Sequence, residues 1–320
     1  MDKGLGKSSH WLSVVFAAAC LVSGVLGMGT VTQSNSIALA LPQNLRGYKI
    51  ILCGREVPIC ILLLSVLLAM LTACVIFGGG RRIAKTAEKV IPPMALLYLA
   101  FTLTVLCLYH RQIPKAISCI FSSAFSLRSI GGGLLGTGIA KSLITGVQRG
   151  VFSNEAGLGT SAMAASASDE SEPIQQAYAG IVSVFVDTVV LCTLTGLMII
   201  VTGVWEVAEN GAAAASAAWQ EGLPLPPQIT EFLLFLFLAF FGYTSIIGWN
   251  YYAEQSARYL FHSNSGVLLY QCLYLLAVFL GPFLSAEFSW MVADYTNALM
   301  ILPNLLALCL LRKDVLRLLK

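Results

Sequence analysis

The side chains that could do chemistry are polar groups placed inside long apolar stretches. Gln33 and Asn35 lie near one end of the apolar stretch 11–41, after small residues that begin at Gly27. An amide left unpaired in an apolar environment is costly, so both side chains need partners. Hydrogen bonds to a neighbouring helix would satisfy them, and so would a polar or zwitterionic ligand. The residues alone leave both interpretations open.

A second candidate group combines two adjacent hydroxyls with an aromatic ring. Thr244 and Ser245, with backbone carbonyls from a neighbouring interrupted helix, would form an oxygen site suited to a small cation. Trp249 follows four to five residues later, where its ring could wall a small pocket. Alternatively, the hydroxyls bond to carbonyls of their own helix and the Trp packs in the core.

A third candidate is the apolar stretch 113–147, which is interrupted at 127–129 and again by the glycines 131–133. We expect two pieces of one broken helix, with Phe121 and Phe125 on one face of the first piece. A broken helix at membrane depth exposes backbone groups and helix dipoles that can hold a carboxylate or a cation. A simple glycine hinge or kink is the alternative.

The block 149–159 is rich in glycine and carries Arg149, Asn154 and Glu155. Ser153 or Asn154 is expected to cap the following helix, with Glu155 near its N-terminus and able to pair with Arg149. Asp187 lies inside another apolar stretch, where it could contact an ion or a gate, or be a buried structural acid. We assign these residues gating or structural roles.

No catalytic group emerges from the sequence. The three histidines are scattered, the nine cysteines form no CxxC pair, and no nucleophile is matched with a base. We therefore expect no enzyme activity, no metal centre, no cofactor and no disulfide framework. The net charge of +3 is modest and no basic patch is interleaved with aromatic residues, so nucleic acid is not an expected partner.

Composition shows which elements must position these groups. Of the 320 residues, 57% are apolar and 11% are charged, against about 25% charged in soluble domains. A helix needs about 20 apolar residues to cross a bilayer. With the broken stretch we expect about eight transmembrane helices in an all-α polytopic protein. The other seven predicted spans are 11–41, 58–77, 90–109, 174–202, 229–253, 267–284 and 290–311.

The distribution of basic residues predicts the orientation. Lys and Arg accumulate in cytoplasmic loops, and most of those in this chain share one side with both termini if the spans alternate. The loop 203–228 has three glutamates and no basic residue, as an external loop would. We therefore expect a multi-pass protein of the cell membrane with both termini in the cytoplasm.

Taken together, these motifs resemble the alanine/glycine:cation symporter family, whose members are sodium:alanine symporters. The block 149–159, with its Ser-Asn-Glu-Ala-Gly-Leu-Gly sequence, is the most specific of them, and the resemblance covers nearly the whole chain. The other motifs that carry it are 33–38, 77–84, 120–125, 185–188, 248–254 and 300–304.

The resemblance implies a LeuT-like bundle built from two inverted repeats. It implies symport of a small neutral amino acid, alanine or glycine, with sodium as the coupling ion. Gln33, Phe125 and Trp249 would then contact the amino acid, and Thr244 and Ser245 would contribute to the sodium site.

The resemblance further implies that residues 1–320 form a single transporter domain matching core helices three to ten of the family, without the first two. Thr30 stands where an Asn is common in the family. The alternative hypothesis is a truncated, non-transporting remnant or an assembly partner of the same family.

Overall fold

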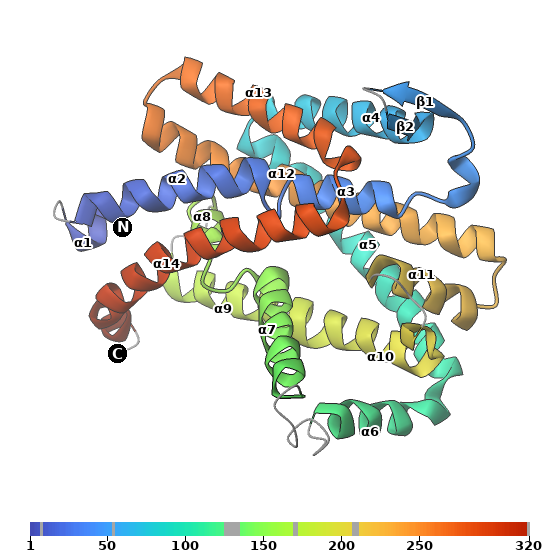
Figure 1. Ribbon diagram of the computed structural model, residues 1–320. Helices are drawn as coiled ribbons and strands as arrows, with labels where there is room; N and C mark the ends of the chain where they lie inside the picture. Colours follow the sequence, from blue (N-terminus) through green and yellow to red (C-terminus); the bar gives the residue numbers. More distant parts are fainter. Residues whose placement is uncertain (7–8, 53–54, 125–134, 169–171, 207–210, 319–320) are drawn as a thin grey trace. The chain divides into compact units, whose positions relative to one another are not determined.

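The structure is a computed structural model that describes residues 1–6, 9–52, 55–124, 135–168, 172–206 and 211–318. Almost all of this is helical (Figure 1). The main elements are α1 (Asp2–Leu5), α2 (His10–Leu26), α3 (Val31–Leu39), β1 (Lys49–Leu52), β2 (Arg55–Pro58), α4 (Ile59–Ile76), α5 (Gly80–Leu108), α6 (Ile113–Ala124), α7 (Leu135–Asn154), α8 (Thr160–Ala165), α9 (Pro173–Val184), α10 (Cys192–Thr202), α11 (Gly211–Gly222), α12 (Pro227–Phe261), α13 (Asn264–Leu280) and α14 (Ala286–Leu318).

Within the described residues, seven helical stretches are long and apolar enough to cross a membrane, as a polytopic all-α protein requires. They are His10–Leu39, Ile59–Ile76, Gly80–Leu108, Pro173–Thr202, Pro227–Phe261, Asn264–Phe283 and Ala286–Lys313. Each corresponds to one of the seven continuous spans predicted above. The centre of the predicted broken span, 125–134, lies outside the described residues, so the count of eight stays a prediction.

Three local features differ from the expectations. The first span is divided into α2 and α3 by an interruption at residues 27–30, where Gly27 and Gly29 have low helix propensity. A seven-residue π-helical stretch, η5 (Phe185–Leu191), joins α9 to α10. The loop after α3 forms an antiparallel hairpin of β1 and β2, in which Lys49 and Glu56 form a 3.0 Å ion pair.

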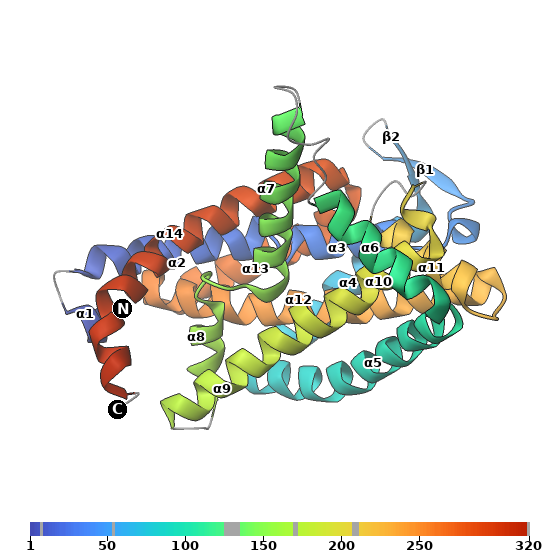
Figure 2. The ribbon, with the colours of Figure 1, turned by 90° about the horizontal axis from the view of Figure 1, so that it is seen from below.

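The first of two compact units contains residues 1–93, 156–177 and 235–320. Inside it, α2 lies alongside α14, as both views show, and α13 packs on α4 (Figures 1 and 2). Its core includes the fully buried side chains of Ile37, Ile246, Tyr270 and Tyr274. Small residues allow the close approach of helices here, since Gly24 lies directly against Ala253.

The second unit contains residues 94–155 and 178–234. Its core is built around Trp219 of α11, which is fully buried. The rings of Tyr98 and Phe101, both on α5, lie 5.4 and 5.6 Å from the Trp219 ring. The Tyr98 hydroxyl forms a 2.7 Å hydrogen bond with Thr195, which joins α5 to α10.

Trp219→Ala should destabilise the second unit by about 3–5 kcal/mol, because it removes the largest buried side chain of that core. Thermal unfolding of the purified protein in detergent measures this loss. Trp11→Ala is the matched control, because the Trp11 side chain is 58% exposed. Equal shifts in Tm for the two variants would contradict the described packing.

Candidate functional site

The interruption between α2 and α3 is held by side-chain hydroxyls within the first unit. All four residues, 27–30, are buried. The N–H of Gly27 still donates to the Ser23 carbonyl at 2.8 Å, as in a helix. The Thr30 hydroxyl then donates back to the Gly24 carbonyl, and the Ser34 hydroxyl donates to the Thr30 carbonyl at 2.9 Å. The chain therefore changes from one helix to the next without leaving these backbone groups unpaired.

The indole ring of Trp249 lies directly against the interruption. A Cβ atom on Gly29 would overlap this ring, so only glycine allows the contact. Trp249 is 2% exposed, and its ring makes an edge-on contact with that of Tyr252 at 5.9 Å. The structure thus places Trp249 beside a helix break, although a different one from the break predicted near Phe125.

Helix α12 follows α2 and α3 along one continuous contact. Gly24 meets Ala253, Gly29 meets Trp249, and Ile37 meets Gly242. Positions 242, 245, 249 and 253 recur every three to four residues, so they share one face of α12. Ser245 therefore lies on the face turned toward α3, whereas Thr244 is about 100° away around the helix.

Gln33 lies in the same interface, because its backbone carbonyl adjoins Gly242 and its side chain is half-buried. Gln33, Ser245 and Trp249 are thus brought to one contact between α3 and α12. The Thr244 hydroxyl instead donates to the Phe241 carbonyl of its own helix at 2.9 Å. For Thr244 this arrangement favours the intrahelical alternative over a cation ligand. Phe125 lies outside the described residues.

Asn35 has a structural partner. Its Nδ2 donates to the carbonyls of Gly281 and Leu284 at 3.1 and 2.7 Å. These carbonyls follow the end of α13, so the amide ties α3 to the turn between α13 and α14. The interhelical interpretation is therefore confirmed for Asn35.

Asn250 is a candidate that the sequence interpretation missed. Its side chain is fully buried, and its Oδ1 accepts a 3.2 Å hydrogen bond from the Tyr270 hydroxyl. Its Nδ2 has no hydrogen-bond partner among the described residues. A buried donor without a partner is costly and calls for a ligand or a water molecule. The signal in the sequence was an Asn inside an apolar helix, directly after Trp249.

One turn further along α12, the buried acid Glu254 is fully paired. Its Oε1 accepts hydrogen bonds from Arg258, the shorter at 2.7 Å, and its Oε2 accepts one from Gln271 at 3.3 Å. Glu254 is 6% exposed. A buried carboxylate needs such partners, so this group connects α12 to α13.

The predicted cap at 153–154 is wrong. Asn154 is the last residue of α7, Glu155 has a φ of 53°, and the next helix begins only at Thr160 after the N-cap Gly159. The left-handed residues Glu155, Gly157 and Gly159 form a turn, which separates the two helices.

Asp187 has a structural partner within the second unit. The Ser153 hydroxyl donates to the Asp187 carboxylate at 2.6 Å, so the end of α7 is tied to the π-helical stretch η5. The guanidinium of Arg149 lies 5.6 Å from the centre of the Phe152 ring. The proposed pairing of Arg149 with Glu155, and a gating role for either residue, stay predictions.

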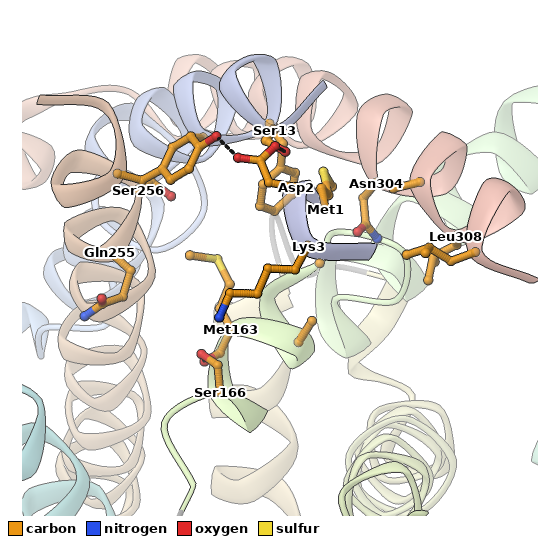
Figure 3. Close-up of a pocket in the computed structure, with 17 residues that line it drawn as sticks. Met1, Asp2, Lys3, Ser13, Met163, Ser166, Gln255, Ser256, Asn304 and Leu308 are labelled. Atoms are coloured by element: carbon orange, nitrogen blue, oxygen red, sulfur yellow. Dashed lines mark hydrogen bonds between the residues drawn. The ribbon is translucent and has the colours of Figure 1, made fainter. Parts of the chain in front are cut away.

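A cavity of about 600 Å³ also lies in the first unit, among α1, α2, α8, α12 and α14 (Figure 3). At its edge the Asp2 carboxylate accepts hydrogen bonds from Ser13 and Tyr259, each at 2.5 Å. Ser13 is the main cause that lowers the pKa of Asp2 from 3.8 to about 2. These bonds therefore favour the folded state above pH 3.8 and are lost as the pH falls toward 2.

Gly29→Ala should destabilise the protein by about 1–3 kcal/mol, because the added methyl group overlaps the Trp249 ring. The same change should cost much less in a Trp249→Gly background, which removes both the ring and the Trp249 Cβ that lies equally close to the added methyl group. Thermal unfolding of the single and double variants gives the interaction free energy between positions 29 and 249. Gly248→Ala is the control, since a Cβ there meets open space. Additive effects of the two substitutions would contradict the contact.

Comparison with known proteins gives the family. The model of the sodium:alanine symporter family matches residues 1–320. An uncharacterized transporter of Haemophilus influenzae is 35% identical over 98% of this chain and 66% of its own length. The sodium/alanine symporter AgcS of Methanococcus maripaludis is 35% identical over 97% of this chain and 64% of its own. The putative sodium/proton-dependent alanine carrier protein YrbD of Bacillus subtilis is 34% identical over all of this chain and 65% of its own.

The chain thus spans just under two thirds of the length of these relatives. The family match, together with the apolar helices, indicates a multi-pass membrane protein. Because the family model covers every residue, this chain belongs to the sodium:alanine symporter family.

Proposed function

We propose that this protein takes part in the symport of a small neutral amino acid, alanine or glycine, with sodium across the cell membrane. The family membership supports sodium-coupled amino-acid transport as the class of activity. The observation that carries the assignment of a site is the buried interruption at 27–30, which lies against Trp249. The next residue after Trp249 is Asn250, whose Nδ2 has no hydrogen-bond partner among the described residues.

A small zwitterion suits this interruption. The N-terminus of α3 is the positive end of a helix dipole and favours the substrate carboxylate, while the C-terminus of α2 favours the ammonium. The Nδ2 of Asn250 and the amide of Gln33 supply further hydrogen bonds. The Trp249 ring limits the space beside Gly29, so alanine and glycine fit this role better than large amino acids.

The sodium site in this proposal uses the α3-facing side of α12. Ser245 lies on that side, and its hydroxyl can act as one oxygen ligand. Thr244 lies on another side of α12 and bonds to the Phe241 carbonyl, so it can contribute only if α12 also turns about its axis. Sodium then drives transport because it binds more tightly to the arrangement that also binds the amino acid.

The remaining assignments concern the second unit and the orientation. Phe125 is proposed to contact the substrate side chain. Arg149, Asn154, Glu155 and Asp187 are proposed to have gating or structural roles. For Asp187 a gating role is supported by its place in η5, because π-helical stretches are frequent at functional sites. Both termini are proposed to lie in the cytoplasm, from the distribution of basic residues.

Gln33→Ala and Trp249→Ala should each lower sodium-driven alanine uptake about tenfold, the effect of losing roughly 1.4 kcal/mol of binding. Uptake of radiolabelled alanine by proteoliposomes with an imposed sodium gradient measures this. Trp11→Ala, which changes an exposed ring, is the control and should transport normally. Normal uptake by both test variants would reject the proposed substrate site.

Ser245→Ala should raise the sodium concentration that gives half-maximal uptake, and Thr244→Ala should raise it less. The difference follows from the Thr244 hydroxyl being engaged within its own helix. Uptake measured against sodium concentration at saturating alanine tests both variants. An unchanged sodium dependence in both variants would show that neither hydroxyl binds the sodium ion.

A further inference from the structure

A second, smaller pocket lies inside the second unit, where the first turns of α6 pack against the end of α10. Its volume is about 220 Å³, enough for several water molecules at about 30 Å³ each, and so for a small amino acid. Its polar lining includes Gln112, Lys115, Thr202 and Glu206, and Trp205 and Cys119 also border it.

Two opposite charges line this pocket without neutralising each other. In the part of the second unit that the structure describes, neither Lys115 nor Glu206 forms an ion pair. Lys115 lies in the first turn of α6, at the positive end of that helix dipole. Glu206 follows the end of α10, whose dipole is negative there. The pocket therefore has a positive side and a negative side.

We propose that this pocket binds a free α-amino acid as a zwitterion, separately from the interruption in the first unit. The substrate carboxylate binds the Lys115 ammonium, and the substrate ammonium binds the Glu206 carboxylate. Trp205 is half-exposed and can cover the ligand, with its ring face available to the ammonium. The choice of alanine as the ligand rests on the proposed function. The inference that the pocket binds a zwitterion rests only on its lining residues.

The expected affinity is low. Lys115 and Glu206 are both exposed, and exposed ion pairs are weak and screened by salt. Half-maximal binding is expected at an alanine concentration on the order of 1–10 mM, independent of sodium and weaker at high ionic strength.

The native thiol of Cys119 provides the test, because it borders the pocket. Its alkylation by iodoacetamide, a neutral reagent, is followed by mass spectrometry of the purified whole chain in detergent, without sodium. We expect about 50 mM alanine to slow the reaction on the order of fivefold or more. Propionate and ethylamine, which each carry one of the two charges, should protect much less. Gln112→Cys supplies a second thiol on the same pocket if Cys119 reacts too slowly.

The variants Lys115→Gln and Glu206→Gln should each abolish protection by alanine. Arg111→Gln and Glu221→Gln remove the same charges outside this pocket and should leave protection intact. Absence of protection, or protection that persists in both test variants, would overturn the proposal. Sodium-driven uptake without protection would reject this pocket alone, whereas protection without uptake would reject the proposed transport function alone.

Discussion

The contact between Gly29 and Trp249 is the constraint on which the candidate site depends. The indole can lie against the α2–α3 backbone only because residue 29 has no side chain. This contact fixes α12 at the level of the interruption, and the matching contacts at Gly24 and Gly242 fix it on either side. The proposed substrate site would therefore depend on backbone geometry as much as on polar side chains.

Most polar side-chain groups around the interruption have hydrogen-bond partners, so the one at Asn250 that lacks a partner in the described part of the chain is informative. Thr30, Ser34 and Asn35 each donate to a backbone carbonyl, and Glu254 has partners on both oxygens. Inside a low-dielectric region such pairing stabilises a single arrangement. Against this background, the unpartnered Nδ2 of Asn250 is a donor without a structural function among the described residues. A ligand carboxylate would supply the missing acceptor.

Hydropathy predicted the helical class and the positions of seven spans, because twenty apolar residues have few other stable arrangements in lipid. It could not predict the interruption at 27–30. Gly27 and Gly29 fit close helix packing equally well, and the distinction depends on Trp249, more than 200 residues away in sequence. The cap predicted at 153–154 failed for a related reason. Ser153 and Asn154 are good capping residues, but the glycine turn after them places them at the end of α7.

Gln33, Ser245 and Trp249 were singled out by residue type and by the family resemblance, and the structure brings them to one interface, while their binding roles stay predictions. Thr244 could not be separated from Ser245 by sequence, because adjacent hydroxyls look equivalent until the face of the helix is known. Asn250 was overlooked because nothing in the sequence indicates which of its hydrogen bonds are made. Pairing is a property of the folded chain, and local patterns do not encode it.

The central claim is that the interruption at 27–30 holds the amino acid and responds to sodium. Amide hydrogen exchange of the segment 27–34, followed by mass spectrometry, tests it most directly. The account predicts that alanine and sodium together slow exchange in this segment on the order of tenfold, and that either alone has a much smaller effect. Unchanged exchange in this segment, in protein that transports alanine under the same conditions, would contradict the account.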